Sequence, residues 1–186
     1  ILWGPNHISL LKLSESKIAQ LGIGRKFQKP TVFEKQSVYD NLLMALKNRR
    51  SVISNLGYKK NFVDQKIIEK TSKVINLEKS ISRVASELSH GQKQWLEIGM
   101  LLAQDPKVLL VDEPAAGMTI DEREKTVELL KSISIKKSVI VVEHDMEFVK
   151  SLNCNVIVLN EGSVLAEGNM EHVSQNEKVI DVYLGR

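Results

Sequence analysis

"KVLLVDEPAAGM", residues 107–118, runs from an apolar segment directly into two adjacent carboxylates and a proline. An apolar run without alternation predicts a strand buried on both faces, as in a parallel sheet. Asp112 and Glu113 follow this strand at its carboxyl end, the edge of an open parallel sheet where ligands bind. Because Pro114 disfavours helical backbone at the residue before it, we expect Glu113 to be extended and to project from the strand end.

Three other apolar runs predict further strands of the same kind, namely "GIGRKF" (22–27), "SVIVVE" (138–143) and "NVIVLN" (155–160). Helical patterns at 121–133 and 145–152 separate the last three of the four strands. This alternation predicts βαβ units with right-handed crossovers, and so an α/β fold with a parallel sheet.

Residues 37–105 differ from this pattern, because they contain helical periodicity and no strand run. Helices are predicted within 37–50, 63–75 and 89–104, and Pro106 stops the last of them. We therefore expect an all-helical subdomain inserted into the α/β core. Short antiparallel strands are predicted at the N-terminal "ILWGPNHIS" (1–9) and at "GSVLAEG" (162–168), with a modest helix from there to Arg186.

The composition is that of an ordinary globular chain. Its 186 residues are 42% hydrophobic, which suits one core or one core with a smaller subdomain. The 26 Lys and Arg residues and 23 Asp and Glu residues give a formal charge of only +3, and the basic pairs are scattered, so no nucleic-acid partner is expected. No apolar stretch approaches the roughly 18 residues of a membrane span, so any membrane association is expected to come through a partner.

Polar residues follow the ends of the main strands: Gln28 after the first, Asp112 and Glu113 after the second, Glu143 and His144 after the third. Two adjacent carboxylates are tolerable if one holds a divalent cation and the other a water molecule. Mg²⁺ suits such a sparse site, because it keeps waters and takes its other oxygens from phosphates. The competing interpretation is that Asp112 caps a turn, Glu113 is exposed and His144 is an ordinary loop histidine.

A second candidate site lies in "ELSHGQKQWLEIGMLLAQDP", residues 87–106. Ser89 stands at the N-cap of the predicted helix, and Gly91 offers no side chain to obstruct a ligand. A helix start of this kind can bind phosphate, although a serine N-cap is more often structural. His7 and His172 are interpreted as surface residues.

These segments together resemble the ATP-binding subunit of ABC transporters. The matching segments are "FQKPTVF" (27–33) as Q-loop, "LSHGQ" (88–92) as signature motif, "VLLVDEPAAGM" (108–118) as Walker B strand and D-loop, and "VVEHDM" (141–146) with the switch histidine. More narrowly, "LGIGRKFQKPTVFE" (21–34), residues 88–106 and the closing "VYLGR" resemble the urea-type branch of the branched-chain amino-acid importer ATPases. His90 in place of the usual signature glycine, and "AAGM" (115–118) in the D-loop, are similar to that branch.

The resemblance implies a role for each matched residue. Asp112 would hold Mg²⁺, with Gln28 sensing metal and water, and Glu113 would orient or deprotonate the water that attacks the γ-phosphate. His144 would contact that phosphate. The signature residues Ser89, His90, Gly91 and Gln92 would bind the ATP held by a second ATP-binding subunit.

The resemblance also implies the setting of the protein. It predicts a P-loop NTPase-like sheet and a homodimer or heterodimer of ATP-binding subunits. The dimer would dock on transmembrane permease subunits at the cytoplasmic face of the cell membrane. The activity implied is ATP hydrolysis that drives the uptake of urea or a related small polar solute.

The 186 residues contain no match to G-x-x-x-x-G-K-[ST], the loop that cradles phosphates. The resemblance places this loop ahead of residue 1. We therefore expect residues 1–186 to be an ABC ATPase domain without its P-loop segment, with 37–105 as the helical subdomain, and we expect weak ATP binding, negligible hydrolysis and an unpaired sheet edge.

Two other functions are compatible with parts of the sequence. A non-catalytic partner module would present only the signature face to another ATPase. A chromosome-maintenance or DNA-repair ATPase would share the signature, but such proteins carry long heptad insertions, and none is present here.

Overall fold

The computed structural model describes residues 2–4, 7–46 and 62–184. The chain divides into two compact units, residues 1–142 and residues 143–186. The first unit contains the parallel sheet and the long helices, and the second contains a hairpin with short helices.

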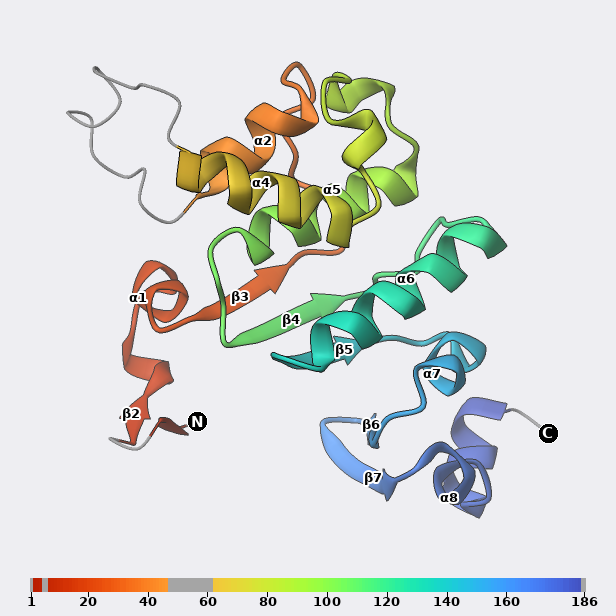
Figure 1. Ribbon diagram of the computed structural model, residues 1–186. Helices are drawn as coiled ribbons and strands as arrows, with labels where there is room; N and C mark the ends of the chain where they lie inside the picture. Colours follow the sequence, from red (N-terminus) through yellow and green to blue (C-terminus); the bar gives the residue numbers. More distant parts are fainter. Residues whose placement is uncertain (1, 5–6, 47–61, 185–186) are drawn as a thin grey trace. The chain divides into compact units, whose positions relative to one another are not determined.

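A three-stranded parallel sheet forms the centre of the first unit (Figure 1). Its order is β3–β4–β5, with β3 at Ile23–Lys26, β4 at Val108–Asp112 and β5 at Ser138–Val142. Lys26 is in register with Val111, and Asp112 with Val142. These strands and their parallel pairing confirm the α/β prediction, and their carboxyl ends share one edge.

Three helices lie on the β3 side of this sheet (Figure 1). They are α2 (Val38–Ala45), α4 (Phe62–Val74) and α5 (His90–Leu102), with 3-10 turns at Glu78–Ser80 and Ala85–Glu87. Gly99 of α5 allows close packing, because a Cβ there would lie 2.5 Å from Ile75 Cδ1 and 3.1 Å from Leu42 Cδ2. The helical predictions for 63–75 and 89–104 are confirmed. The helix predicted within 37–50 ends at Ala45, and residues 47–50 lie outside the described part of the chain.

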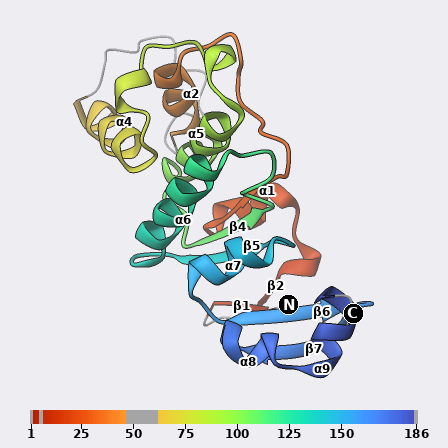
Figure 2. The same cartoon turned by 90° about the vertical axis from the view of Figure 1, so that its right-hand side faces the viewer.

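Helix α6 (Ile120–Ser134) connects β4 to β5 and contacts both α5 and β5 (Figure 2). Its start is fixed by a capping box in which Thr119 and Glu122 bond each other's backbone N–H groups. Behind it, Leu109 is 0% exposed and Val111 1% exposed. On the alternate positions of the sheet, Ile140 is 54% exposed and Val142 60% exposed. One face of the sheet is therefore covered, whereas the other is exposed along β5, so the prediction that these strands are buried on both faces is wrong for β5.

The start of the chain forms a small hairpin, as the sequence predicted. It pairs β1 (Leu2–Trp3) with β2 (Ile8–Ser9) in antiparallel register. A 3-10 turn at Leu10–Lys12 and helix α1 (Glu15–Gln20) follow, and α1 contacts β3.

The second unit begins with α7 (Met146–Leu152), followed by β6 (Val156–Asn160) and β7 (Ser163–Gly168) (Figure 2). The antiparallel strand predicted at 162–168 is confirmed as β7, but β6 was expected in a parallel sheet and instead pairs antiparallel with β7. Glu161 and Gly162, with φ of 47° and 77°, make the tight turn that a two-residue hairpin requires. Ile157 is 55% exposed and Val158 9%, so the strand alternates and is not buried on both faces.

The helix predicted from residue 169 to Arg186 is also corrected, because short pieces replace it. They are α8 (Met170–Ser174), α9 (Glu177–Val179) and a π-helical turn at Ile180–Leu184. Asn169 and Asn176 each accept a hydrogen bond from a backbone N–H two or three residues ahead. Asn169 therefore starts α8 directly after β7, and Asn176 starts α9 as a separate helix after α8.

Candidate functional site

Gln28 and Glu113, which are 85 residues apart in the chain, meet at the carboxyl edge of the sheet. The side-chain amide Nε2 of Gln28 donates a hydrogen bond to Glu113 Oε2. The backbone N–H of Glu113 donates to the carbonyl of Val142, at 2.9 Å, so the residue is tied to the end of β5 as well. The predicted juxtaposition of Gln28 and Glu113 is thus present.

The backbone of Glu113 differs from the prediction. Its φ is 44°, in the left-handed region, whereas Pro114 led us to expect an extended conformation. The chain must leave β4 sharply while Glu113 N–H still bonds to Val142, and this requirement overrides the preference before proline. A non-glycine residue in this region is unfavourable and is often found at functional sites.

Asp112 and Glu113 avoid mutual repulsion by facing different partners. The carboxylate of Asp112 lies 3.5 Å from the guanidinium of Arg25, whereas that of Glu113 accepts from Gln28. Arg25 also lies over the ring of Phe27, at 4.7 Å from its centroid. With side chains 57% and 36% exposed, Arg25 and Asp112 form a solvent-screened pair that a divalent cation could displace.

A buried lysine lies beneath this edge. Lys26 is 0% exposed, and its Nζ donates to the carbonyls of Phe27, at 2.8 Å, and Asp112, at 3.3 Å. Its positive charge therefore lies against the main chain on both sides of the Gln28–Glu113 contact. A lysine in a short strand is ordinarily exposed, so the sequence offered no signal for this role.

Two buried residues of α5 hold the loop that carries Gln28. Gln94, 0% exposed, donates from Nε2 to the carbonyl of Gln28 at 3.2 Å. Glu97, 4% exposed, accepts from the backbone N–H and the hydroxyl of Thr31, at 3.3 and 2.7 Å. Burial raises the pKa of Glu97, although the hydrogen bonds from Thr31 and the charge of Lys26 act in the opposite direction.

The residues of the predicted phosphate site at the start of α5 form exposed hydrogen bonds with one another and with Glu122. Ser89 and Gln92 form a capping box, and the Ser89 hydroxyl also donates to Glu122 Oε1 at 2.6 Å. A Cβ at Gly91 would lie 2.6 Å from Glu122 Cδ, so a side chain there would have to displace the Glu122 carboxylate. Burial acts to raise the pKa of Glu122, but the hydrogen bonds from Ser89 and Thr119 outweigh it and lower this pKa overall.

His90 lies between the start of α5 and the 115–118 stretch. Its Nε2 is 3.2 Å from Gln94 Nε2, and a Cβ at Gly117 would lie 3.3 Å from its Cδ2. The residue that departs from the usual signature thus contacts two other parts of the candidate site.

His144 belongs to the second unit, two residues after Val142 in the chain. Its ring is 73% exposed, and its Nδ1 lies 3.7 Å from Glu143 Oε2. Glu143 also accepts from the backbone N–H of His144 at 3.0 Å. His7 and His172 are exposed, as predicted.

Mg²⁺ is the metal that the sequence suggested at Asp112. Among the described residues there is no cluster of three or more histidine, cysteine or acidic side chains that could hold a metal ion. The Asp112 carboxylate, 36% exposed, still fits Mg²⁺, which takes one or two carboxylates and completes its shell with water and phosphates.

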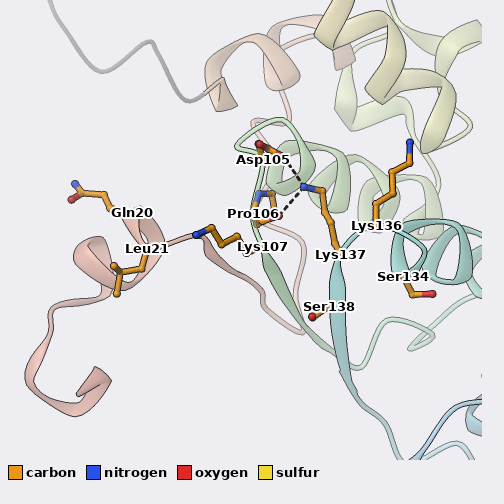
Figure 3. Close-up of a pocket in the computed structure, with 10 residues that line it drawn as sticks. Gln20, Leu21, Asp105, Pro106, Lys107, Ser134, Lys136, Lys137 and Ser138 are labelled. Atoms are coloured by element: carbon orange, nitrogen blue, oxygen red, sulfur yellow. Dashed lines mark hydrogen bonds and ion pairs between the residues drawn. The ribbon is translucent and has the colours of Figure 1, made fainter. Parts of the chain in front are cut away.

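A cavity of about 650 Å³ opens at the opposite end of the strands (Figure 3). Its lining includes Lys107, Lys136 and Lys137, but Lys137 Nζ is paired with Asp105 at 2.6 Å. Figure 3 shows the lysine side chains pointing in different directions instead of toward one centre. The cavity is separate from the carboxyl-edge site.

Residues 2–116 match the family model described as ABC transporter. This match spans more than half of the chain. The chain belongs to the ABC transporter family. Residues 163–186 also match the model of a branched-chain amino acid ATP-binding cassette transporter, so a second ABC match covers the C-terminal segment.

Curated relatives support this membership in the ABC family. The chain is 30% identical over 178 residues to the high-affinity branched-chain amino acid transport ATP-binding protein BraF of Pseudomonas aeruginosa, a match that covers 91% of this chain and 70% of BraF. It is 33% identical over 177 residues to the probable branched-chain amino acid transport ATP-binding protein LivG of Archaeoglobus fulgidus, covering 91% and 68%.

Solved ABC cassettes share the fold. An ATP-binding cassette of an ABC transporter in an ADP conformation has a TM-score of 0.74 and 27% identity, over 92% of this chain and 71% of that one. A nucleotide-free ATP-binding cassette has a TM-score of 0.76 and 26% identity, over 97% and 75%. The P-loop NTPase fold predicted from the sequence is therefore confirmed.

Proposed function

We propose that this chain is the ATP-binding and ATP-hydrolysing subunit of an ABC importer. The observation that carries the proposal is the hydrogen bond from Gln28 to Glu113 at the end of the Walker B strand, beside Asp112. Phosphoryl transfer depends chiefly on positioning and electrostatics, and this edge provides an acid, an amide and a neighbouring carboxylate in fixed positions.

In this proposal each residue has a defined task. Asp112 and Gln28 hold Mg²⁺, which when bound neutralises charge on the phosphates. Glu113 orients or deprotonates the attacking water, and His144 contacts the γ-phosphate. The signature residues Ser89, His90, Gly91 and Gln92 bind the ATP of a second subunit, in a homodimer or heterodimer. Residues 37–105 form the helical subdomain.

The proposed partners at the membrane are transmembrane permease subunits. None of the described helices combines the length and apolar character needed to cross a bilayer. We place the assembled subunit at the cytoplasmic face of the cell membrane, where the permease would hold it.

We propose urea or a related small polar solute as the cargo, on the resemblance of residues 21–34 and 88–106. Branched-chain amino acids are the second candidate, favoured by the similarity of this chain to the branched-chain amino acid transport proteins BraF and LivG. Uptake of labelled urea and labelled leucine, measured in cells with the gene disrupted and then restored, separates them. Loss of urea uptake alone supports the first solute, and loss of leucine uptake alone supports the second.

The catalytic assignment is tested in the same complemented cells. Glu113→Gln preserves shape but removes the base, so solute uptake should fall by about 100-fold or more. Glu161→Gln, in the β6–β7 turn, is the matched control and should leave uptake unchanged. Normal uptake with Glu113→Gln would refute the catalytic assignment.

For the 186-residue chain alone, we propose weak ATP binding. The 186 residues contain no G-x-x-x-x-G-K-[ST] loop, whose lysine would contact a phosphate of ATP. A lysine about 4 Å from a phosphate contributes roughly 4 kcal/mol to binding at an effective dielectric near 20. Its absence corresponds to an affinity about a thousandfold lower. Calorimetry that finds micromolar affinity would contradict this proposal. Full uptake with Glu113→Gln together with weak ATP binding would favour the alternative, a non-catalytic module.

A further inference from the structure

The amide of Gln94 is oriented by the carbonyl of Gln28. Gln94 is 0% exposed, and its Nε2 lies 3.2 Å from Gln28 O. If the amide were reversed, Gln94 Oε1 would face a second acceptor. The Gln28 carbonyl therefore requires the nitrogen of Gln94 on this side.

This orientation determines the protonation of His90. Gln94 Nε2 has two hydrogens and no acceptor capacity, and it lies 3.2 Å from His90 Nε2. His90 Nε2 must then accept the second hydrogen, so a neutral His90 carries its proton on Nδ1. A hydrogen-bonded series runs from His90 through Gln94 to the backbone of Gln28, whose side chain bonds Glu113.

Because Gln94 is buried, water cannot replace a hydrogen bond that its amide loses. Gln94 Oε1 is buried without a hydrogen-bond partner among the described residues. The free-energy cost of leaving this oxygen unsatisfied must be offset by the two hydrogen bonds that Nε2 donates. The ring of His90 also lies against Gly117, where a Cβ would be 3.3 Å from His90 Cδ2.

We infer that His90 and Gln94 are positioning residues that couple the signature segment to the Gln28–Glu113 pair within one chain. His90 lies in the segment proposed to meet the partner's nucleotide, and Glu113 serves the chain's own nucleotide. The histidine at the position of the usual glycine thereby acquires a role that a glycine could not fill. The effect on ATP hydrolysis rests on the proposed function, whereas the hydrogen bonds between His90, Gln94 and Gln28 do not.

The geometry is tested on the nucleotide-free chain by ¹⁵N NMR of its histidines. The chain has 4 histidines, so His90→Gln assigns the signal and His172→Gln, on an exposed helix of the second unit, serves as control. We expect neutral His90 to show an unprotonated Nε2 and a protonated Nδ1. A predominant Nε2–H form, or an even mixture, would overturn the inference.

The positioning is tested with Gln94→Met, which keeps an unbranched side chain and removes both donors. We expect His90 to lose its tautomer preference and the side-chain amide signal of Gln28 to shift. Gln104→Met, in the turn just after the end of α5, is the matched control and should change neither signal. An unchanged Gln28 amide in a folded Gln94→Met chain would overturn the coupling, and the wild-type tautomer decides the question if that variant fails to fold.

In the assembled transporter, Gln94→Met should lower kcat for ATP about tenfold, the equivalent of one hydrogen bond, with KM nearly unchanged. A change in KM alone would count against positioning. Absence of ATPase activity in the wild-type transporter would refute the proposed function while leaving the NMR result standing. The two failures are therefore distinguishable.

Discussion

The two faces of the β3–β4–β5 sheet are built from alternate residues of the same strands, yet they differ sharply. On one face Lys26, Leu109 and Val111 are 0, 0 and 1% exposed. On the other face Ile140 and Val142 are 54 and 60% exposed. The buried face also contains the polar contacts that fix the Gln28 loop. Buried residues on the covered face thus hold the Gln28 loop in position, whereas the Asp112 carboxylate is accessible from the exposed face.

The largest effect that separates the two faces is expected from matched truncations. Leu109→Ala should lower the free energy of unfolding by about 2–5 kcal/mol, because it opens a cavity in packed surroundings. Ile140→Ala, on the neighbouring strand but on the open face, should cost about 1 kcal/mol or less. Urea denaturation of both variants provides the measurement. Equal losses would show that Ile140 is covered in solution.

A second prediction concerns the polar contact between the helices on the covered face. Trp95 Nε1 donates to Thr126 Oγ1 at 2.8 Å, and Thr126 is 0% exposed. Thr126→Val should leave the indole N–H unsatisfied and cost about 1–3 kcal/mol.

The control for this contact is Thr126→Ser, which keeps the hydroxyl. It should preserve the fluorescence emission of Trp95, which Thr126→Val should shift. Identical emission in the two variants would argue that the hydrogen bond is absent.

The strands of the sheet were predictable because they are continuous apolar runs in the sequence. The runs at 107–112 and 138–143 predicted β4 and β5, and Pro106 marked the end of the preceding helix region. The run at 155–160 has the same composition but pairs antiparallel with β7. Composition alone does not distinguish a strand buried on both faces from one half of a hairpin, and the deciding turn at Glu161 and Gly162 is local.

The candidate site was predictable where side chains follow strand ends. Gln28 and Glu113 meet as expected, because parallel strands bring their carboxyl ends together. The contributions of Lys26, Gln94 and Glu97 were not predictable. They depend on which face of a short strand or helix turns inward beside a particular loop, and charged or amide residues at those positions are normally exposed.

The smallest effect is a dependence of stability on pH. Burial raises the pKa of Glu97 in the folded chain, so its contribution to stability is fully present below the unfolded pKa, about 4.3, and is lost as pH rises through the folded pKa. The stability of the wild type relative to Glu97→Gln should therefore fall as pH rises from about 4.

The control is Glu34→Gln. The hydrogen bond from Lys93 lowers the pKa of Glu34, whose side chain is 61% exposed, so its contribution has the opposite sign and is screened by solvent. Denaturant titrations at a series of pH values test both variants. A wild type that gains stability over Glu97→Gln with rising pH would show that Glu97 is ionised at little cost.

Gly99 gives the helical layer a mechanical property. Ile75 and Leu42 rest almost on the backbone of α5, since no side chain separates them from it. Close-packed interiors transmit displacement instead of absorbing it. A displacement of α2 or α4 would therefore be transmitted to α5 through the contact at Gly99, and α5 would move as a rigid body.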